Sequence, residues 1–244
     1  MSVPSACPPA GQGRDPQRSI QRWFDVVYAA KGLGYLRPAE YYALFLDHLD
    51  VRAGERLLDV GCGPGLLLSQ AMGRGLHCAG IDLSEVALGL AHECARGALL
   101  AHCNAEALCF PDQSFDHVTC IGVLEHFLDV DRALAEMRRV ARPGAGICIL
   151  VPNARSLARI CGLRRTASGR PGEAIATLDE WAQVFRRNGF LIERVRRDEW
   201  GVRRLRRALP GWRSRNSCAA AGTPRSRSLV PLRYANQYVF ILRP

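Results

Sequence analysis

The sequence feature that most constrains the fold is the stretch Leu57–Gly65, Leu-Leu-Asp-Val-Gly-Cys-Gly-Pro-Gly. Its apolar half is typical of a buried parallel strand, and its glycine half predicts a tight turn into a helix over 66–72. Gly61, Gly63 and Gly65 permit positive φ angles and a close approach of a ligand to the backbone. Because open α/β sheets bind ligands at the carboxyl ends of their strands, we expect a binding site at this turn.

The same stretch resembles motif I of the class I S-adenosylmethionine-dependent methyltransferases. The resemblance places Asp59 near the amino end of the cofactor. It also places the glycine turn, including Cys62, against the cofactor. A dinucleotide site is the rival interpretation, because Asp59 and Asp82 also fit it. The dinucleotide fingerprint places its third glycine three positions after the second, whereas here Gly65 follows Gly63 by two. A pyrophosphate also favours a helix N-terminus without a nearby carboxylate, so Asp59 suits a cationic ligand better.

The second predicted strand, 76–82, ends in an acidic residue. A carboxylate at this point can accept hydrogen bonds from both hydroxyls of a ribose. The resemblance gives this role to Asp82 and places Leu83 beside the cofactor. The alternative is that Asp82 only caps the helix that follows.

After the third predicted strand, 98–104, the order Asn104-Ala105-Glu106 resembles the segment of the family that holds adenine. The family often has Asp where this chain has Asn104. The amide oxygen of Asn104 can still accept a hydrogen bond from the adenine amine. The resemblance further implies that the backbone N–H of Ala105 or Glu106 meets a ring nitrogen. A polar loop without a ligand is the alternative.

The fourth predicted strand ends at Ile121, which the resemblance places against the cofactor, and the triplet Leu-Glu-His follows it. This triplet resembles the methyltransferase type 11 or ubiquinone-biosynthesis-like group. Some quinone O-methyltransferases complete a metal site with a further Glu, but that position is Gly122 here, so we predict no bound metal. His126 is the candidate general base, with Glu125 beside it. The alternative is that both residues only orient the loop under the substrate.

The resemblance implies an α/β fold: a Rossmann-like doubly wound seven-stranded sheet with the order 3-2-1-4-5-7-6, the last strand antiparallel, and an N-terminal helical cap. Residues 1–17 are expected to be a disordered leader and 18–244 a single methyltransferase domain. The cap, 18–50, either packs on the sheet edge or also covers the cofactor pocket. Pro and Gly predict a turn over 142–146, followed by a fifth strand over 147–151.

The net charge of +10 is concentrated in the last third of the chain. Residues 1–154 have 13 Lys+Arg and 17 Asp+Glu, a net −4, and residues 155–244 have 20 and 6, a net +14. Arginines cluster in two predicted basic inserts, 154–172 and 200–230. Trp and Leu among them fit peripheral contact with an anionic membrane surface, and a solvated surface is the alternative. Nucleic acid is disfavoured because no recognition motif is present.

Ten cysteines occur without a Cys-x-x-Cys pair, and several lie in apolar, strand-like runs. They are expected to be free thiols in a reducing compartment. Because the sequence has no signal-like segment and no apolar run of about 18 residues, we predict a cytoplasmic protein, with peripheral membrane contact left open.

These features predict an enzyme that moves a methyl group from S-adenosylmethionine to a small-molecule or lipid-linked acceptor by in-line displacement. Oxygen is the favoured acceptor atom, and nitrogen and carbon stay open. Two alternatives remain: a non-catalytic cofactor-binding scaffold that acts through its basic C-terminal third, and an NAD-dependent oxidoreductase. The oligomeric state is not predicted.

Overall fold

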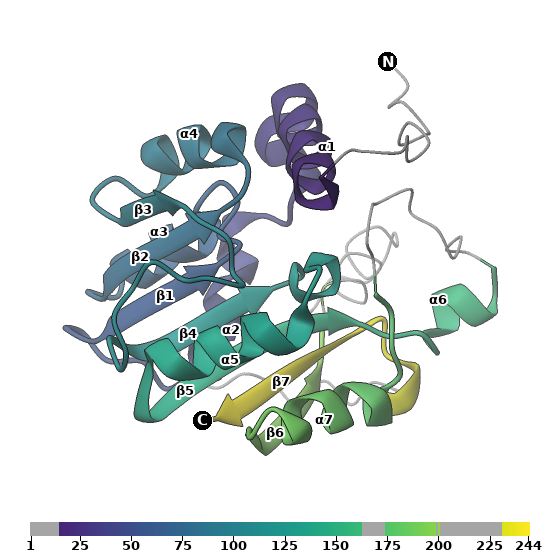
Figure 1. The fold of residues 1–244 in the computed structure, drawn as a ribbon. Coiled ribbons are helices and arrows are strands. Elements are labelled where there is room, and N and C mark those ends of the chain that lie inside the picture. The colour runs from purple at the N-terminus through teal and green to yellow at the C-terminus, as the bar shows by residue number, and fades with distance from the viewer. Residues whose placement is uncertain (1–14, 163–173, 199, 201–230) are drawn as a thin grey trace, which may run out of the picture.

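The computed structural model describes residues 15–162, 174–198, 200 and 231–244, which form a seven-stranded sheet flanked by helices (Figure 1). The strand order is β3-β2-β1-β4-β5-β7-β6. β1 to β5 are mutually parallel, and β7 runs antiparallel to both β5 and β6. The predicted fold class, including the order and the antiparallel last strand, is confirmed.

The bounds of the elements follow the sequence closely around the glycine turn. The strands are β1 (Arg56–Val60), β2 (His77–Asp82), β3 (Leu99–His102), β4 (Phe115–Ile121), β5 (Ala141–Pro152), β6 (Leu191–Arg197) and β7 (Gln237–Arg243). The α-helices are α1 (Pro16–Lys31), α2 (Ala43–Asp47), α3 (Leu66–Met72), α4 (Glu85–Cys94), α5 (Val130–Val140), α6 (Leu157–Ile160) and α7 (Leu178–Arg187). The short 3-10 helices are η1 (Gly32–Tyr35), η2 (Ala39–Tyr41), η3 (Leu124–His126) and η4 (Leu232–Tyr234).

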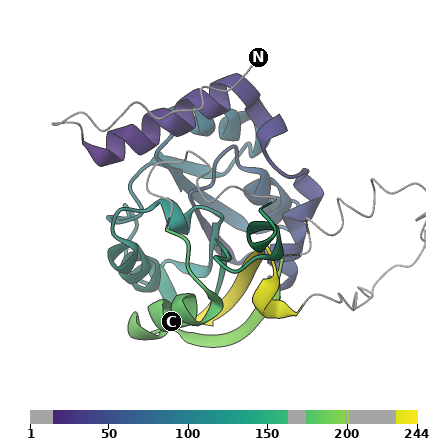
Figure 2. The same cartoon turned by 90° about the vertical axis from the view of Figure 1, so that its right-hand side faces the viewer.

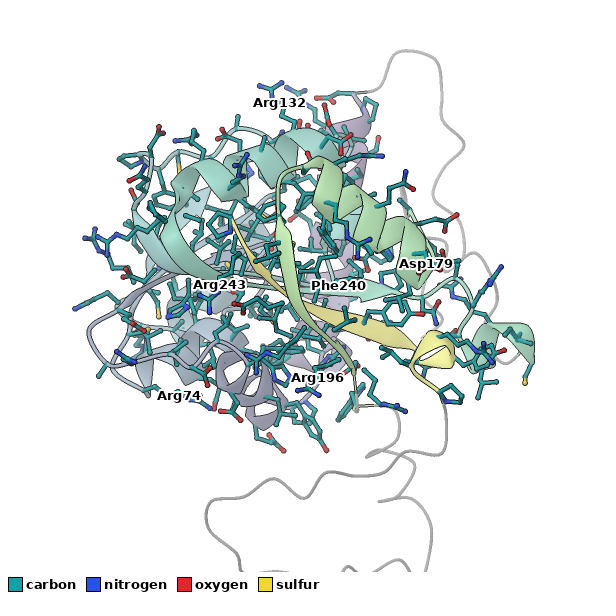
Figure 3. All side chains as sticks on the ribbon, turned by 90° about the horizontal axis from the view of Figure 1, so that it is seen from below. Arg74, Arg132, Asp179, Arg196, Phe240 and Arg243 are labelled. Atoms are coloured by element: carbon teal, nitrogen blue, oxygen red, sulfur yellow. The ribbon has the colours of Figure 1, made fainter. Side chains whose placement is uncertain are left out.

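The sheet separates two apolar layers. Alternate residues of the central strands point to opposite faces, so Leu58 packs toward α5 and α7, whereas Leu57 packs toward α2 and α3. Phe240 of β7 is fully buried against Phe185 of α7, with ring centroids 4.8 Å apart. Figure 3 shows Phe240 among packed side chains. Helices on both faces hold the central strands rigid, and the site lies at their carboxyl ends.

The prediction of a turn over 142–146 is wrong, because these residues belong to β5. Ala141 pairs with Phe115 and Gly146 pairs with His117, so the extra residues between them form an irregularity within the strand. Gly144 accommodates it with a φ of 81°. Pro and Gly mark bulges as well as turns, and the sequence alone does not separate the two.

The predicted leader, 1–17, and the two predicted basic inserts lie only partly within the described residues. Helix α1 begins at Pro16, within the predicted leader, where Asp15 accepts a hydrogen bond from the backbone N–H of Gln17 as the N-cap. The rest of the leader, 1–14, lies outside the described residues, as do 163–173 and 201–230 of the two basic inserts. In the part that is described, no helix combines the length and apolar character needed to cross a membrane.

Candidate active site

The glycine turn lies against the end of β2. The backbone N–H groups of Gly61 and Cys62 both donate to the carbonyl of Ile81, at 2.8 Å each. Gly61 has a φ of 72°, and a Cβ placed on it would lie 2.6 Å from Val123. Only glycine fits this position, because a side chain would be strained and would also collide with the segment after β4.

Two pockets open at the carboxyl ends of β1, β2 and β4. They meet at four residues that line both: Phe24, Gly61, Asp82 and Val123. The first pocket brings together these predicted residues: Gly61, Asp82, Leu83, Asn104, Ala105, Glu106 and His126. The second brings together Asp59, Gly61, Cys62, Gly63, Asp82 and Ile121. Gly65 and Glu125 line neither of these two pockets, although both were predicted at the site.

Asp59 is a buried carboxylate in the second pocket, with 3% of its surface exposed. The hydroxyl of Thr119 donates to its Oδ1 at 2.7 Å. Burial raises the pKa of Asp59 from 3.8 to about 7; the Thr119 hydrogen bond opposes the rise and the negative charge of Asp82 adds to it. A cation beside Asp59 would favour the ionised form.

We expect Asp59→Asn to stabilise the fold at alkaline pH and to weaken binding of a cationic ligand. Because the pKa of Asp59 is raised in the folded state, its contribution to stability is complete below pH 3.8 and is lost as the pH rises through about 7. The variant should exceed the wild type by about 1–3 kcal/mol at pH 8 and match it at pH 4. Urea unfolding at both pH values measures this, and an equal difference at pH 4 and pH 8 would contradict it.

Asp82 connects the glycine turn to the end of β2. Its Oδ2 accepts from the backbone N–H of Gly63 and its Oδ1 from that of Ser84, each at 2.8 Å. The N-cap of α4 is Ser84, whose hydroxyl accepts from the N–H of Ala87, so capping does not account for Asp82. Burial raises the pKa of Asp82, and its backbone hydrogen bonds oppose that rise.

The loop after β3 forms one side of the first pocket. The Oδ1 of Asn104 accepts from the backbone N–H of Glu106 at 3.0 Å. The carboxylate of Glu106 accepts from the N–H groups of Leu128 and Asp129, at 2.9 and 3.0 Å, and so secures the approach to α5. The N–H of Glu106 is thus engaged within the loop, and that of Ala105 is the backbone donor we retain for a ligand.

Glu125 and His126 lie in η3 and are each 2% exposed. His126 lines the first pocket, and its ring meets that of Phe24 edge-on with centroids 5.4 Å apart. Glu125 points elsewhere: its charge acts on Cys120, whose thiol pKa is raised by burial and further by Glu125. Within the described residues, no group of three or more His, Cys, Asp or Glu side chains is placed to hold a metal ion.

The N-terminal segment supplies pocket residues that were not predicted. Phe24 lines both pockets, Ile20 the first, and Tyr28 and Tyr42 the second. Burial raises the pKa of Tyr42 to about 12. The sequence left open whether this cap only packs on the sheet edge or also covers the pocket, because nothing local distinguishes a core contact from a pocket contact. Figure 2 shows α1 crossing one side of the molecule above the sheet.

The strand order and the two pockets at the glycine turn define a Rossmann-like cofactor-binding domain. Residues 58–150 match the model of the family described as "Methyltransferase domain". This match confirms the predicted resemblance to the class I S-adenosylmethionine-dependent methyltransferases. Eight cysteines in the described part of the chain are free thiols, as expected.

Curated relatives are similar over about half of the chain. The ubiquinone biosynthesis O-methyltransferase of Hahella chejuensis is 39% identical over 139 residues, which cover 52% of this chain and 54% of that protein. The protein of the same name from Aromatoleum aromaticum is 38% identical over 134 residues, covering 52% and 55%. The chain thus spans about half the length of the curated relatives it matches.

Solved structures share the fold at low sequence identity. An S-adenosylmethionine-dependent methyltransferase from Mesorhizobium loti has a TM-score of 0.61 at 19% identity and covers 85% of this chain and 98% of its own. The [4+2]-cyclase SpnF has a TM-score of 0.66 at 18% identity and covers 94% and 97%. A phosphoethanolamine N-methyltransferase 2 from Haemonchus contortus, in complex with S-adenosyl-L-methionine, has a TM-score of 0.63 at 19% identity and covers 93% and 57%.

Proposed function

We propose that this chain is an S-adenosylmethionine-dependent methyltransferase that acts on a hydroxyl oxygen of a small-molecule or lipid-linked acceptor. The observation that carries the proposal is the pair of pockets that meet at Gly61 and Asp82: the half-buried carboxylate of Asp82 lines both, and the buried carboxylate of Asp59 lines the second. S-adenosylmethionine also has two parts, an adenosine and a cationic amino-acid end. Their junction would lie at Gly61, where a ligand can approach the backbone closely.

The first pocket fits the adenosine part. Asp82 lies at the end of β2, where its carboxylate can accept from the ribose hydroxyls. Asn104 and the backbone N–H of Ala105 stand on the wall where they can hydrogen-bond adenine. The second pocket fits the amino-acid part, because Asp59 offers a buried carboxylate to its ammonium group.

When bound, S-adenosylmethionine would supply an activated methyl group, and the chain has to align the acceptor and remove one proton. We assign removal of this proton to His126, and its position on the wall of the first pocket supports that role. Phe24 packs edge-on against His126 and lines both pockets, so it orients the imidazole and helps to exclude water.

Oxygen as the acceptor atom is supported by the curated relatives, which are named as O-methyltransferases. The fold alone does not establish methyl transfer, since one similar structure is a [4+2]-cyclase. A cofactor-binding scaffold is therefore the second candidate. Contact with an anionic membrane stays a prediction, because most arginines of the basic inserts lie outside the described residues. Cytoplasmic localisation also stays a prediction.

Binding and turnover separate these candidates. Calorimetry should show binding of S-adenosylhomocysteine and none of NAD, and Asp82→Ala should weaken binding about 10- to 100-fold through lost charge-assisted hydrogen bonds. Asp112→Ala, an exposed carboxylate paired with Arg139 at 2.7 Å, is the matched control. Labelled S-adenosylmethionine with a panel of phenols and lipid-linked phenols then tests transfer. Binding without transfer to any acceptor would favour the scaffold, and binding of NAD alone would overturn the proposal.

A further inference from the structure

Helix α1 is joined to α4 by a side-chain contact beside the two pockets. The hydroxyl of Ser84 donates to Oδ1 of Asp25 at 2.6 Å, and the N–H of Val86 approaches the same oxygen at 3.5 Å. The Ser84 oxygen also accepts from the N–H of Ala87 at 3.1 Å. Asp25 therefore takes the one proton that this N-cap hydroxyl can donate, and it fixes the orientation of the hydroxyl.

The same contact leads directly to the proposed ribose ligand. The backbone N–H of Ser84 donates to Oδ1 of Asp82, and Oδ2 of Asp82 accepts from the N–H of Gly63, both at 2.8 Å. Asp25, Ser84, Asp82 and the glycine turn thus form one hydrogen-bonded series. It runs from the helical cap to the point where the two pockets meet.

The residue before Asp25 reaches the opposite wall. Phe24 packs against His126 on the β4 side, whereas Asp25 bonds Ser84 on the β2 side. Two consecutive residues of α1 therefore contact the segments that follow β4 and β2, on either side of the first pocket. A ligand that occupies both pockets lies beneath this helix, because Ile20 and Phe24 line the first pocket and Tyr28 lines the second.

We propose that Asp25 is a positioning residue for cofactor binding: it holds α1 across the pockets and, through Ser84, fixes the position of Asp82. The inference rests on the proposed function, because it concerns the same ligand. With the Asp25–Ser84 contact broken, α1 loses its attachment on one wall. The bound cofactor should then leave faster.

The negative charge of Asp25 also affects the ionisation of Asp82. Negative charge on Asp25 opposes ionisation of Asp82, in the same direction as burial, while the N–H groups of Ser84, Gly63 and Leu83 favour it. Among the described residues, Asp82 also acts on the carboxyl group of Asp59 and on the thiol of Cys62. Asp25→Asn keeps an oxygen to accept from Ser84 and removes the charge, so Asp82 should ionise at a lower pH.

The test measures S-adenosylhomocysteine binding and dissociation for the full chain from pH 5 to 8. Asp25→Ala should raise the dissociation constant about tenfold, mainly through a faster off-rate, as expected for a lost hydrogen bond to a charged group. Asp25→Asn should bind like the wild type at pH 8, and its loss of affinity on acidification should begin at a lower pH. Asp15→Ala, which removes the N-cap of α1 itself, should change neither measurement by more than about twofold.

Hydrogen exchange over residues 16–31 reports the attachment of α1 directly, and it should speed up in Asp25→Ala but not in Asp25→Asn. An unchanged off-rate in Asp25→Ala, or an acid limb that stays in place in Asp25→Asn, would overturn the inference. If Asp25→Ala does not fold, the Asn variant still decides, because it keeps the hydrogen bond. If the wild type does not bind S-adenosylhomocysteine, the proposed function fails rather than the role of Asp25.

Discussion

Replacing Arg37 by alanine is expected to lower the free energy of unfolding by about 3–5 kcal/mol, the usual cost of removing one partner of a buried ion pair. Arg37 joins the helical cap to the far edge of the sheet. Its guanidinium donates to Asp198 at 2.9 Å and to Gln237 at 2.8 Å, and it lies 5.6 Å from the ring centroid of Phe45. The side chains of Arg37 and Asp198 are only 13% and 10% exposed, so alanine would leave a carboxylate buried without its cation.

The chain offers a matched control for this ion pair. Arg187 and Asp131 form an Arg–Asp pair at 2.8 Å with side chains 55% and 52% exposed. Arg187→Ala should cost no more than about 1 kcal/mol. The double variant Arg37→Met, Asp198→Leu should recover most of the lost stability, because it leaves no charge unpaired. Urea unfolding measures all three, and equal losses in Arg37→Ala and Arg187→Ala would show that burial is not the cause.

The parts of the fold that the sequence predicted are those with a local signature. The glycine turn, the helix 66–72 and the polar residues at successive strand ends each depend on a short stretch of chain, and the structure shows the helix with those bounds. The parallel order of the strands then brings most of the predicted residues to the two pockets. Gly65 is an exception: a Cβ on it would meet Ala91 of α4 and Ala95, the residue after that helix, at 3.1–3.3 Å, so its role is helix packing.

The parts that were missed depend on contacts between distant residues. Ser84 and Asp25 are 59 residues apart, and Arg37 and Asp198 are 161 apart. An aspartate in an amphipathic helix has the same local sequence pattern whether its side chain faces water or the N-terminus of another helix. For the same reason the aromatic residues of α1 left open whether the cap only packs on the sheet or also covers the pocket, and only the three-dimensional arrangement shows which of them line a pocket.

If His126 is the general base, we expect His126→Gln to reduce the rate of methyl transfer by about 10²–10⁴-fold. Glutamine keeps a polar side chain of similar reach on the pocket wall but cannot take up a proton. Loss of a base should leave the affinity for S-adenosylhomocysteine nearly unchanged, because the proposed cofactor contacts of Asp82 and Ala105 do not involve the imidazole. Single-turnover rates with an acceptor found in the panel, and calorimetry on the same samples, measure both effects.

Glu125→Gln separates a base from a scaffold. Glu125 is as buried as His126, at 2% exposure each, and belongs to the same short helix, yet it lines neither pocket. If η3 only supports the substrate loop, the two variants should lose rate, affinity and thermal stability together. If His126 is the base, only His126→Gln should lose rate at constant affinity.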